Sequence, residues 1–446
     1  MSNMAEKKIA ALEDYGSTPV PEGKGKGWLG IGIVMWGVAV CLPAFLIAGL
    51  VAGPAKLGTA IGAFLVSSLI LGLIAILTGI IGAQTRLSTG LTIRFTFGKY
   101  GAYVLQMVLF FASWGWFGVQ LGFMAEGFGN GGLALVFGSA VPIWTIKVVG
   151  GILMTLTAMV GFKAIEKLTF VAIPLLLILI IATISSVYGD GVTLASVANT
   201  TAEGAMPFGV AVSVIVGSFI VGALIAPDIT RYAKSKKAGG FGMAFGMVIG
   251  FPLVLILGGI MVKGSGGEFD FSRIMISHNS GFWAFLAVVT IILAAWTTND
   301  NNLYSGALSI NAMFPKINKW VITVISGVIG IIFALVGINT SGGFQTFLGI
   351  LTIVIPPAAG VLILDYFIFK SDDNKGYKPS EIDAVPNFRF IPCIAWILGS
   401  GFGFIIQYTS LTFTTVTALD TMIIGAAFYF VIMLVTKNKI TIKQDA

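Results

Sequence analysis

The sequence contains little charge and almost none of the residues that most often carry out chemistry. Only 10% of its 446 residues are charged, compared with about 25% in soluble domains. One His and two Cys, Cys41 and Cys393, are too few for a disulfide framework or a Cys/His metal site. No phosphate-binding loop, HExxH pair or Ser/His/Asp set occurs in a credible context. The sequence therefore indicates neither an ATPase nor another enzyme, and it calls for no cofactor.

Long apolar runs take up most of the chain. Hydrophobic residues make up 57% of the sequence, and the mean hydropathy is +0.97. Because a membrane-spanning helix needs about 20 mainly apolar residues, the sequence predicts an all-α polytopic membrane protein with the lipid bilayer as its surroundings. The twelve predicted spans lie near residues 28–52, 57–83, 101–128, 140–160, 167–187, 208–230, 240–262, 281–307, 319–337, 344–369, 391–409 and 414–436.

Basic residues gather on one side of these spans. All but four of the 26 Lys and Arg residues fall in segments on the same side as the N-terminus, and the exceptions are Lys56, Lys147, Lys263 and Arg273. This bias predicts a multi-pass protein of the plasma (cytoplasmic) membrane with both termini in the cytoplasm. It also explains the net charge of +7 without a nucleic-acid partner. The N-terminal segment has no short apolar core and is therefore not a signal peptide.

The spans divide into two groups of five followed by two more. An odd number of spans in each group means that the second group enters the membrane with inverted topology. The predicted organisation is a cytoplasmic N-terminal tail (1–27), a first five-helix repeat (28–187), an inverted second repeat (208–369), a cytoplasmic loop (370–390), two additional helices (391–436) and a cytoplasmic C-terminal tail (437–446).

The first span of each repeat is interrupted. Pro43 removes a backbone donor in the first span, and the sixth span contains Gly217-Ser218-Phe219 followed by Pro227. Paired interruptions in corresponding helices indicate a central binding site. The alternative is that Gly and Pro are simply common in membrane helices, where Gly allows close packing. Pro356 and Pro357 predict a further broken or kinked helix in the tenth span.

Six consecutive polar residues, Thr297 to Asn302, lie inside the eighth span. Such residues are costly at bilayer depth unless they find partners. Ala294, Thr297 and Thr298 fall within about 100° around the helix, so two hydroxyls and a carbonyl can converge on a sodium ion, which by analogy with other hard cations prefers oxygen ligands. Freed carbonyls of Gly37 and Val40 can complete the site. Alternatively, both Thr side chains bond back to their own helix.

A planar substrate can be recognised next to this ion. Asn299 lies about 100° further round the helix, and an amide suits a ring that carries both donor and acceptor edges. Trp116 and Gln120 share one face of the third span, and Phe219 can cover the other face of the ring. The alternative is that these aromatic residues only pack. Asp300 remains unassigned: it can carry a proton, pair with a cation or cap a broken helix.

Several segments resemble the nucleobase–cation symporter-1 family, and its cytosine permease branch most. They are Trp296-TTNDN, Gly217-SF, Pro227-DITRY, Trp116-FG, the stretch from Gly82 to Gly98, and PPAAGVLILDY in the tenth span. The resemblance implies a leucine-transporter-like fold of two inverted five-helix repeats plus two helices. It also implies a sodium site at Gly37, Val40, Ala294, Thr297 and Thr298, and a substrate site at Trp116, Gln120, Ser218, Phe219 and Asn299.

The sequence departs from that branch at three positions. Cytosine permeases that resemble this chain carry Gly where Gln120 stands, Gln where Ser113 stands and Ser where Val221 stands. Gln120 is more similar to hydantoin or allantoin carriers. The expected function is import of a nucleobase or related heterocycle by sodium symport with alternating access. Alternatives are proton coupling, a hydantoin, allantoin or pyrimidine vitamin precursor as substrate, and a channel or a substrate sensor.

Overall fold

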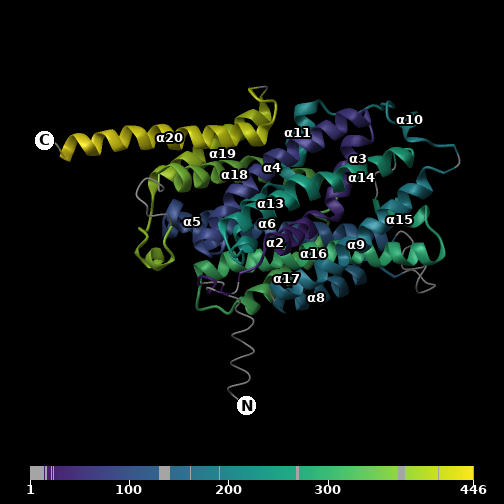
Figure 1. Ribbon diagram of the computed structural model, residues 1–446, viewed down its shortest axis with the longest axis horizontal. Coiled ribbons are helices and arrows are strands. Elements are labelled where there is room, and N and C mark those ends of the chain that lie inside the picture. The colour runs from purple at the N-terminus through teal and green to yellow at the C-terminus, as the bar shows by residue number, and fades with distance from the viewer. Residues whose placement is uncertain are drawn as a thin grey trace, which may run out of the picture.

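The computed structural model is built from helices packed side by side (Figure 1). It describes residues 15, 18–21, 23, 25–129, 141–160, 162–189, 191–267, 271–369, 377–409 and 411–444. The first 14 residues of the predicted N-terminal tail and residues 370–376 of the predicted loop lie outside this part of the chain. Within the described ranges, the β pairing consists of one isolated bridge between Lys26 and Ala233.

The helices of the first half, in chain order, are α2 (Trp28–Ala39), α3 (Leu42–Ala52), α4 (Leu57–Thr85), α5 (Thr89–Phe97), α6 (Lys99–Gly127), α8 (Ile143–Val160), α9 (Phe162–Val187) and α10 (Leu194–Val197). Those of the second half are α11 (Phe208–Leu224), α12 (Pro227–Thr230), α13 (Lys236–Ala244), the π-helix η2 (Phe245–Gly250), α14 (Phe251–Gly264), α15 (Phe271–Ser277), α16 (Gly281–Met313), α17 (Lys319–Leu335) and α18 (Ser341–Leu364). The π-helix η3 (Asp365–Phe369), the 3₁₀-helix η4 (Pro379–Ala384), α19 (Phe390–Tyr408) and α20 (Thr417–Gln444) follow.

Helix length and composition confirm the class of membrane protein. Among the described residues, seven helices are long and apolar enough to cross a membrane, and the bent pair α2/α3 makes an eighth span. Shorter apolar helices lie in α8, α9, α17 and α19, where the remaining four spans are predicted. Large apolar side chains such as Leu73, Val104 and Ile249 face outward, as expected for contact with lipid. The count of twelve spans stays a prediction.

The helix α16 lies between α2 and α6 on one side and α8 and α17 on the other (Figure 1). All of its residues from Thr297 to Met313 are buried, so the polar run faces protein on every side rather than lipid. A helix that is buried all round needs no amphipathic stripe. This location explains how six polar residues are tolerated at this depth.

The last two helices pack beside α18 at one edge of the molecule (Figure 1). Arg389, which precedes α19, forms a bidentate ion pair with Asp365 at 2.6 and 2.9 Å. Tyr377 and Tyr429 donate to the same carboxylate. Burial alone would lower the pKa of Arg389, but the hydrogen bonds and charge of Asp365 raise it above its ordinary value. This network ties α19 and α20 to the end of α18.

Pro356 and Pro357 do not break the tenth span. Helix α18 continues through both residues, and the bend of more than 40° found within the described chain lies in the pair α2/α3. Neighbouring helices pack tightly here: a Cβ added at Gly399 or at Gly425 would lie 2.7 Å from the Cβ of Pro357. Close packing of small residues on both neighbours holds the helix through the proline pair.

Candidate functional site

The first span is broken between α2 and α3, which meet at an angle of 62°. The Cys41 N–H donates to the Ala39 carbonyl at 3.1 Å, where an unbroken α-helix would use Gly37. Likewise the Ala44 N–H donates to Cys41 at 3.0 Å rather than to Val40. Pro43 sits in the first turn of α3, where a missing N–H costs nothing. The predicted interruption is therefore confirmed, and it releases the carbonyls of Gly37 and Val40 from helical bonding.

Two hydroxyls of α16 face this break. Thr298 Oγ1 lies 3.3 Å from the Val38 carbonyl and 3.2 Å from the Ala294 carbonyl. Thr297 Oγ1 lies 3.2 Å from the same Ala294 oxygen. Thus the structure brings Ala294, Thr297 and Thr298 together at the end of α2, as predicted, and the hydroxyls also make the back-bonds expected of Thr in a membrane helix. Their role as ion ligands stays a prediction.

A cavity of about 40 Å³ lies next to these hydroxyls. Its walls come from the break in the first span and from α6, α11, α14 and α16. The lining residues are Val38, Cys41, Pro43, Ala44, Ile47, Trp116, Gln120, Ser218, Phe219, Val221, Gly222, Ile225, Phe251, Thr298, Asn301 and Asn302. We call this space the central cavity. It contains four of the five predicted substrate residues together with one predicted ion ligand.

Gln120 is the most unusual polar residue of the central cavity. Its side chain is fully buried, and neither of its amide atoms has a nitrogen or oxygen partner among the described residues; the Cys41 thiol, a weak donor, lies next to it. A buried amide without partners is costly, so it points to a ligand that supplies both a donor and an acceptor. Ser218, by contrast, is satisfied locally, because its hydroxyl donates to the Ile215 carbonyl at 2.7 Å.

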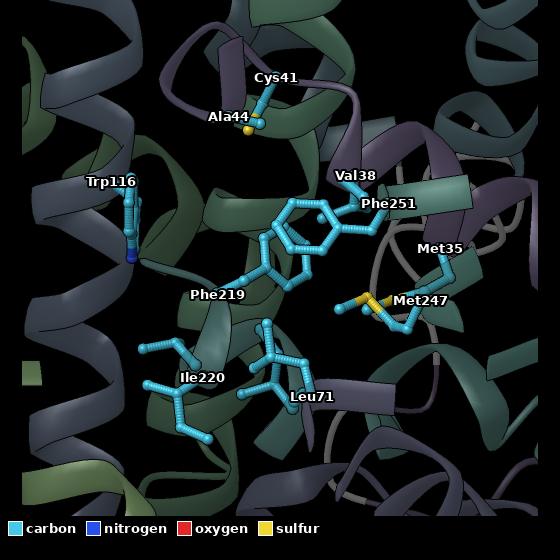
Figure 2. Packing of buried hydrophobic residues seen from close by; sticks show 14 of the residues in the cluster. Met35, Val38, Cys41, Ala44, Leu71, Trp116, Phe219, Ile220, Met247 and Phe251 are labelled. Atoms are coloured by element: carbon cyan, nitrogen blue, oxygen red, sulfur yellow. The ribbon is translucent and has the colours of Figure 1, made fainter. Parts of the chain in front are cut away.

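Aromatic side chains form two walls of the central cavity. Figure 2 shows Trp116 and Phe219 projecting from separate elements into the same region, with Phe251 beside Phe219. The ring centroids of Phe219 and Phe251 lie 5.0 Å apart. Trp116 makes an edge contact with Phe347 of α18 at 5.3 Å. An indole face and a phenyl face lining one cavity are suited to stacking on a planar ring.

Asn299 lies away from the central cavity. Its amide Nδ2 is 3.3 Å from both the Phe117 carbonyl and the Met154 Sδ, so the side chain faces α6 and α8. Asn301 and Asn302 line the cavity instead. They lie about 60° and 40° around α16 from Thr298, whereas Asn299 lies about 100° away on one side. Asn301 and Asn302 are three and four residues after Thr298, and this spacing is the sequence signal that places them on the same face of α16 as Thr298.

The sixth span is broken later than the sequence predicted. Helix α11 continues through Gly217, Ser218 and Phe219 to Leu224, and the chain turns at Ile225 and Ala226 before α12 begins at Pro227. Gly217 serves helix packing, because a Cβ there would overlap the hydroxyl of Thr352 on α18. The break itself is consistent with Pro227, which has no N–H to donate to the Ala223 carbonyl. Ile225 leaves helical geometry there, whereas Ala226 keeps it.

Buried polar side chains close the face of the molecule on which the N-terminal segment lies. Arg231 is 1% exposed. It donates to the Tyr15 carbonyl at 2.7 Å and to the Tyr232 hydroxyl at 3.1 Å, and it also donates to the Tyr304 hydroxyl. We call Tyr15, Arg231, Tyr232 and Tyr304 the N-terminal plug. Backbone bonds from Lys26 to Tyr232 and from Lys234 to Lys26 fasten the N-terminal segment over it.

The opposite face carries a much larger cavity of about 770 Å³, which we call the vestibule. It is bounded by the ends of α3 and α6, the beginnings of α11 and α18, and the turn before α20. Its lining residues are Leu46, Ile47, Leu50, Phe123, Glu126, Met206, Val210, Ser213, Val214, Asn339, Thr340, Phe344, Leu348, Gly349, Thr352, Thr415 and Thr417. Ile47 also lines the central cavity, so one side chain adjoins both spaces.

In this all-helical membrane bundle the first span is bent at a break, and the sixth is interrupted at Ile225 and Ala226. Such a bundle around a central cavity defines a transporter, not an enzyme. The chain belongs to the family of permeases for cytosine, purines, uracil, thiamine and allantoin, whose profile matches residues 19–376. The resemblance to the nucleobase–cation symporter-1 family is thereby confirmed, including the cytosine permease type.

Individual proteins agree with this placement. The cytosine permease of Escherichia coli (strain K12) is 29% identical over 397 residues, which is 87% of this chain and 88% of that protein. The hydantoin permease of Microbacterium maritypicum is 26% identical over 298 residues, covering 62% of this chain and 60% of that one. The solved structure of Mhp1, a nucleobase–cation symport-1 family transporter in a closed conformation with bromovinylhydantoin bound, superposes with a TM-score of 0.83 at 19% identity, covering 96% of each chain. The fold is leucine-transporter-like.

Proposed function

We propose that this protein imports a nucleobase, or a closely related planar heterocycle, across the plasma (cytoplasmic) membrane by sodium symport. The observation that carries the proposal is the central cavity. It combines Trp116 and Phe219 as stacking surfaces with Gln120, a buried amide without a nitrogen or oxygen partner among the described residues, and it reaches the Thr298 hydroxyl. The cytosine permeases among the relatives make cytosine the first substrate to test.

Sodium is favoured as the coupling ion by oxygen atoms at the break in the first span and on α16. The carbonyls of Gly37 and Val40 are released from helical bonding, and the Ala294 carbonyl lies within 3.2 Å of both Thr297 and Thr298. Neutral oxygen donors suit a hard monovalent cation. Because the ligands come from both α2 and α16, an ion bound between them would hold the two helices together and shape the adjacent central cavity.

The central cavity must widen to accept a ring. A volume of about 40 Å³ holds about three water molecules, whereas ligand pockets usually measure about 300–1,000 Å³. We infer that substrate enters from the vestibule as the walls between the two spaces move apart, and leaves when the N-terminal plug opens. With most Lys and Arg residues on the plug side, that side would be cytoplasmic, and transport would run inward.

A hydantoin or allantoin is a second candidate substrate, favoured by Gln120. The amide of Gln120 offers a donor and an acceptor to a ring edge, and hydantoin and allantoin permeases are both similar in sequence to this chain. Cytosine and hydantoin present different edges to the same amide. Competition between labelled cytosine and unlabelled hydantoin therefore ranks the two substrates directly.

The experiment is uptake of labelled cytosine and hydantoin into proteoliposomes with an inward gradient of sodium, potassium or protons. The proposal expects saturable, concentrative uptake with the sodium gradient, which also excludes a channel. Equal uptake with sodium and potassium would contradict sodium coupling. Uptake that follows only the proton gradient would favour the alternative of a proton symporter.

A further inference from the structure

The vestibule is large enough to hold a small molecule of its own. Its volume of about 770 Å³ falls within the range of about 300–1,000 Å³ that is usual for ligand pockets, whereas the central cavity measures about 40 Å³. The two spaces share only Ile47 among their lining residues. A molecule that fits the vestibule therefore does not fit the central cavity in this structure, and the two spaces are separate candidate sites.

Glu126 is the only charged residue that lines the vestibule. Its Oε1 accepts a hydrogen bond from Asn339 Nδ2 at 2.5 Å, but an amide brings no net charge. Among the described residues no cationic nitrogen lies within 4.0 Å of the Glu126 carboxylate. A carboxylate has room for about four hydrogen bonds, and a charge without a counter-charge is costly away from water. Glu126 therefore lacks a counter-charge that a ligand can supply.

Asn339 contributes a second acceptor to the wall of the vestibule. The residue is 4% exposed and lies against α6, where a Cβ added at Gly122 would be 2.3 Å from Asn339 Oδ1. Its Nδ2 is used by Glu126, whereas its Oδ1 has no hydrogen-bond partner among the described residues. A buried acceptor without a partner is costly. Glu126 and Asn339 together therefore call for a ligand that carries hydrogen-bond donors.

Aromatic rings lie beside this pair of acceptors. Phe123 is three residues before Glu126 on α6, so the phenyl ring and the carboxylate share one face of the helix. Phe344 of α18 meets Phe123 edge to face, with the ring centroids 5.5 Å apart. Aromatic faces attract cations that lie within about 6 Å of the ring centroid. Leu46 and Leu50 add apolar surface from α3. The walls thus combine one negative charge with aromatic and aliphatic side chains.

We propose that the vestibule is a second binding site, which takes an organic cation with an apolar body and uses Glu126 as its counter-ion. The cationic group donates hydrogen bonds to Glu126 and Asn339, and the apolar body packs on Phe123 and Phe344. A cation held there blocks the way to the central cavity and inhibits import. The inhibition rests on the proposed function, whereas the binding does not.

A matched pair of compounds tests the chemistry of the site. The probe is 2-naphthamidine, which carries a cationic amidinium group on two fused rings, and its neutral counterpart is 2-naphthamide. Isothermal titration of the purified wild type should show one saturable site for the amidine, with a Kd at least about tenfold lower than that for the amide. Absence of amidine binding, or equal Kd values for the two compounds, would overturn the proposal.

Variants of two glutamates locate the counter-charge. Glu126→Gln keeps an acceptor for Asn339 but removes the charge, so we expect the Kd for the amidine to rise about 20-fold and the Kd for the amide to stay the same. Glu203→Gln is the matched control, because Glu203 lines a neighbouring cavity and not the vestibule. It should bind the amidine like the wild type. An unchanged Kd in a folded Glu126→Gln protein would sink the assignment, and if that variant does not fold, the two compounds still decide the matter on the wild type.

A further variant and an uptake assay separate the two cavities and the two proposals. Gln120→Ala alters the central cavity, so the Kd for the amidine should stay the same. A weakened amidine in that variant would place the cation in the central cavity instead. In proteoliposomes the amidine should inhibit uptake by the wild type, and Glu126→Gln should raise the inhibition constant by the same factor as the Kd. If the wild type imports neither cytosine nor hydantoin, the proposed function fails, but the titrations still decide whether the vestibule binds the cation.

Discussion

The two ends of the transport path differ in how they are closed. At the N-terminal plug, a buried guanidinium holds two tyrosine hydroxyls and the backbone of the N-terminal segment. At the other end, a vestibule of about 770 Å³ reaches Ile47, which also lines the central cavity. The plug is held by charge-assisted hydrogen bonds, whereas mainly apolar side chains lie below the vestibule. In this structure, access to the central cavity is therefore easier from the vestibule.

The two ends therefore differ in the free energy that opening requires. Breaking the plug separates a buried cation from its acceptors, which costs several kcal/mol unless new partners replace them. Moving Ile47 and its neighbours only rearranges apolar contacts. We infer that opening the plug is the harder step of the transport cycle. Binding of substrate and ion in the central cavity must therefore favour the opening of the plug.

The largest expected effect comes from removing the centre of the plug. Arg231→Ala deletes the bonds to Tyr15, Tyr232 and Tyr304, a loss of about 3 kcal/mol. The central cavity should then open toward the N-terminal face. In a Cys393→Ser background, where Cys41 is the only cysteine, we expect a membrane-impermeant thiol reagent applied from that face to label Cys41 on the order of a hundredfold faster.

Tyr232→Phe is the matched control for this experiment. It removes one hydroxyl but leaves the aromatic ring, whose centroid lies 4.9 Å from the guanidinium carbon of Arg231. It should change the labelling rate much less. If Arg231→Ala labels no faster than the wild type from the N-terminal face, the plug is not the barrier.

The next effect concerns the cavity between the two ends. Trp116→Ala removes the indole face, and loss of one stacking surface costs about 1–3 kcal/mol. We expect the Kd for the heterocycle to rise about fivefold to 150-fold, with the fold intact. Isothermal titration measures this value, and Trp116→Phe should recover part of the affinity. An unchanged Kd in the alanine variant would place the substrate elsewhere.

Gly222 lines the central cavity and Gly349 lines the vestibule. The same Gly→Ala substitution at both positions therefore compares the two spaces. A Cβ at Gly222 would lie 2.5 Å from the ring of Phe219, whereas a Cβ at Gly349 meets nothing within 4 Å. Gly222→Ala should displace Phe219 and weaken binding by about 1.5 kcal/mol. Gly349→Ala should leave transport unchanged. Equal effects of the two variants on the substrate Kd would contradict the assigned role of Phe219.

The smallest expected effect concerns the proposed ion ligands. Thr298→Ala removes a hydroxyl that lies between Ala294 and Val38, at a cost of about 1 kcal/mol. We expect the sodium concentration for half-maximal uptake to rise about fivefold, while Thr298→Ser stays close to the wild type. A sodium response that is identical in all three proteins would remove Thr298 from the ion site.

The sequence was sufficient for the features that follow from local chemistry. Apolar runs set the helices, Pro43 marked the break in the first span, and helical spacing grouped Ala294, Thr297 and Thr298 correctly. Trp116 and Gln120, at i and i+4, do line one cavity. Each of these depends on the period of a single helix or on one residue with a fixed backbone preference.

Features that depend on the orientation of one helix toward another could not be predicted in the same way. Asn301 and Asn302, rather than Asn299, line the central cavity. Their i+3 and i+4 spacing from Thr298 marks one face of α16, but only the rotation of α16 within the bundle decides that this face meets the cavity. Gly217 resembled a helix break, but the side chain of Thr352, far away in sequence, explains it. The N-terminal plug joins Tyr15, Arg231 and Tyr304 from three separate segments. Such contacts become visible only in the packed structure.

We infer that one cavity binds the heterocycle and that sodium strengthens this binding. The most direct test is equilibrium binding of cytosine and of hydantoin to the purified protein, measured in sodium and in potassium at equal ionic strength. We predict one saturable site with a lower Kd in sodium, and loss of that site in Gln120→Ala. Binding that is equally tight in potassium and indifferent to Gln120→Ala would contradict the account.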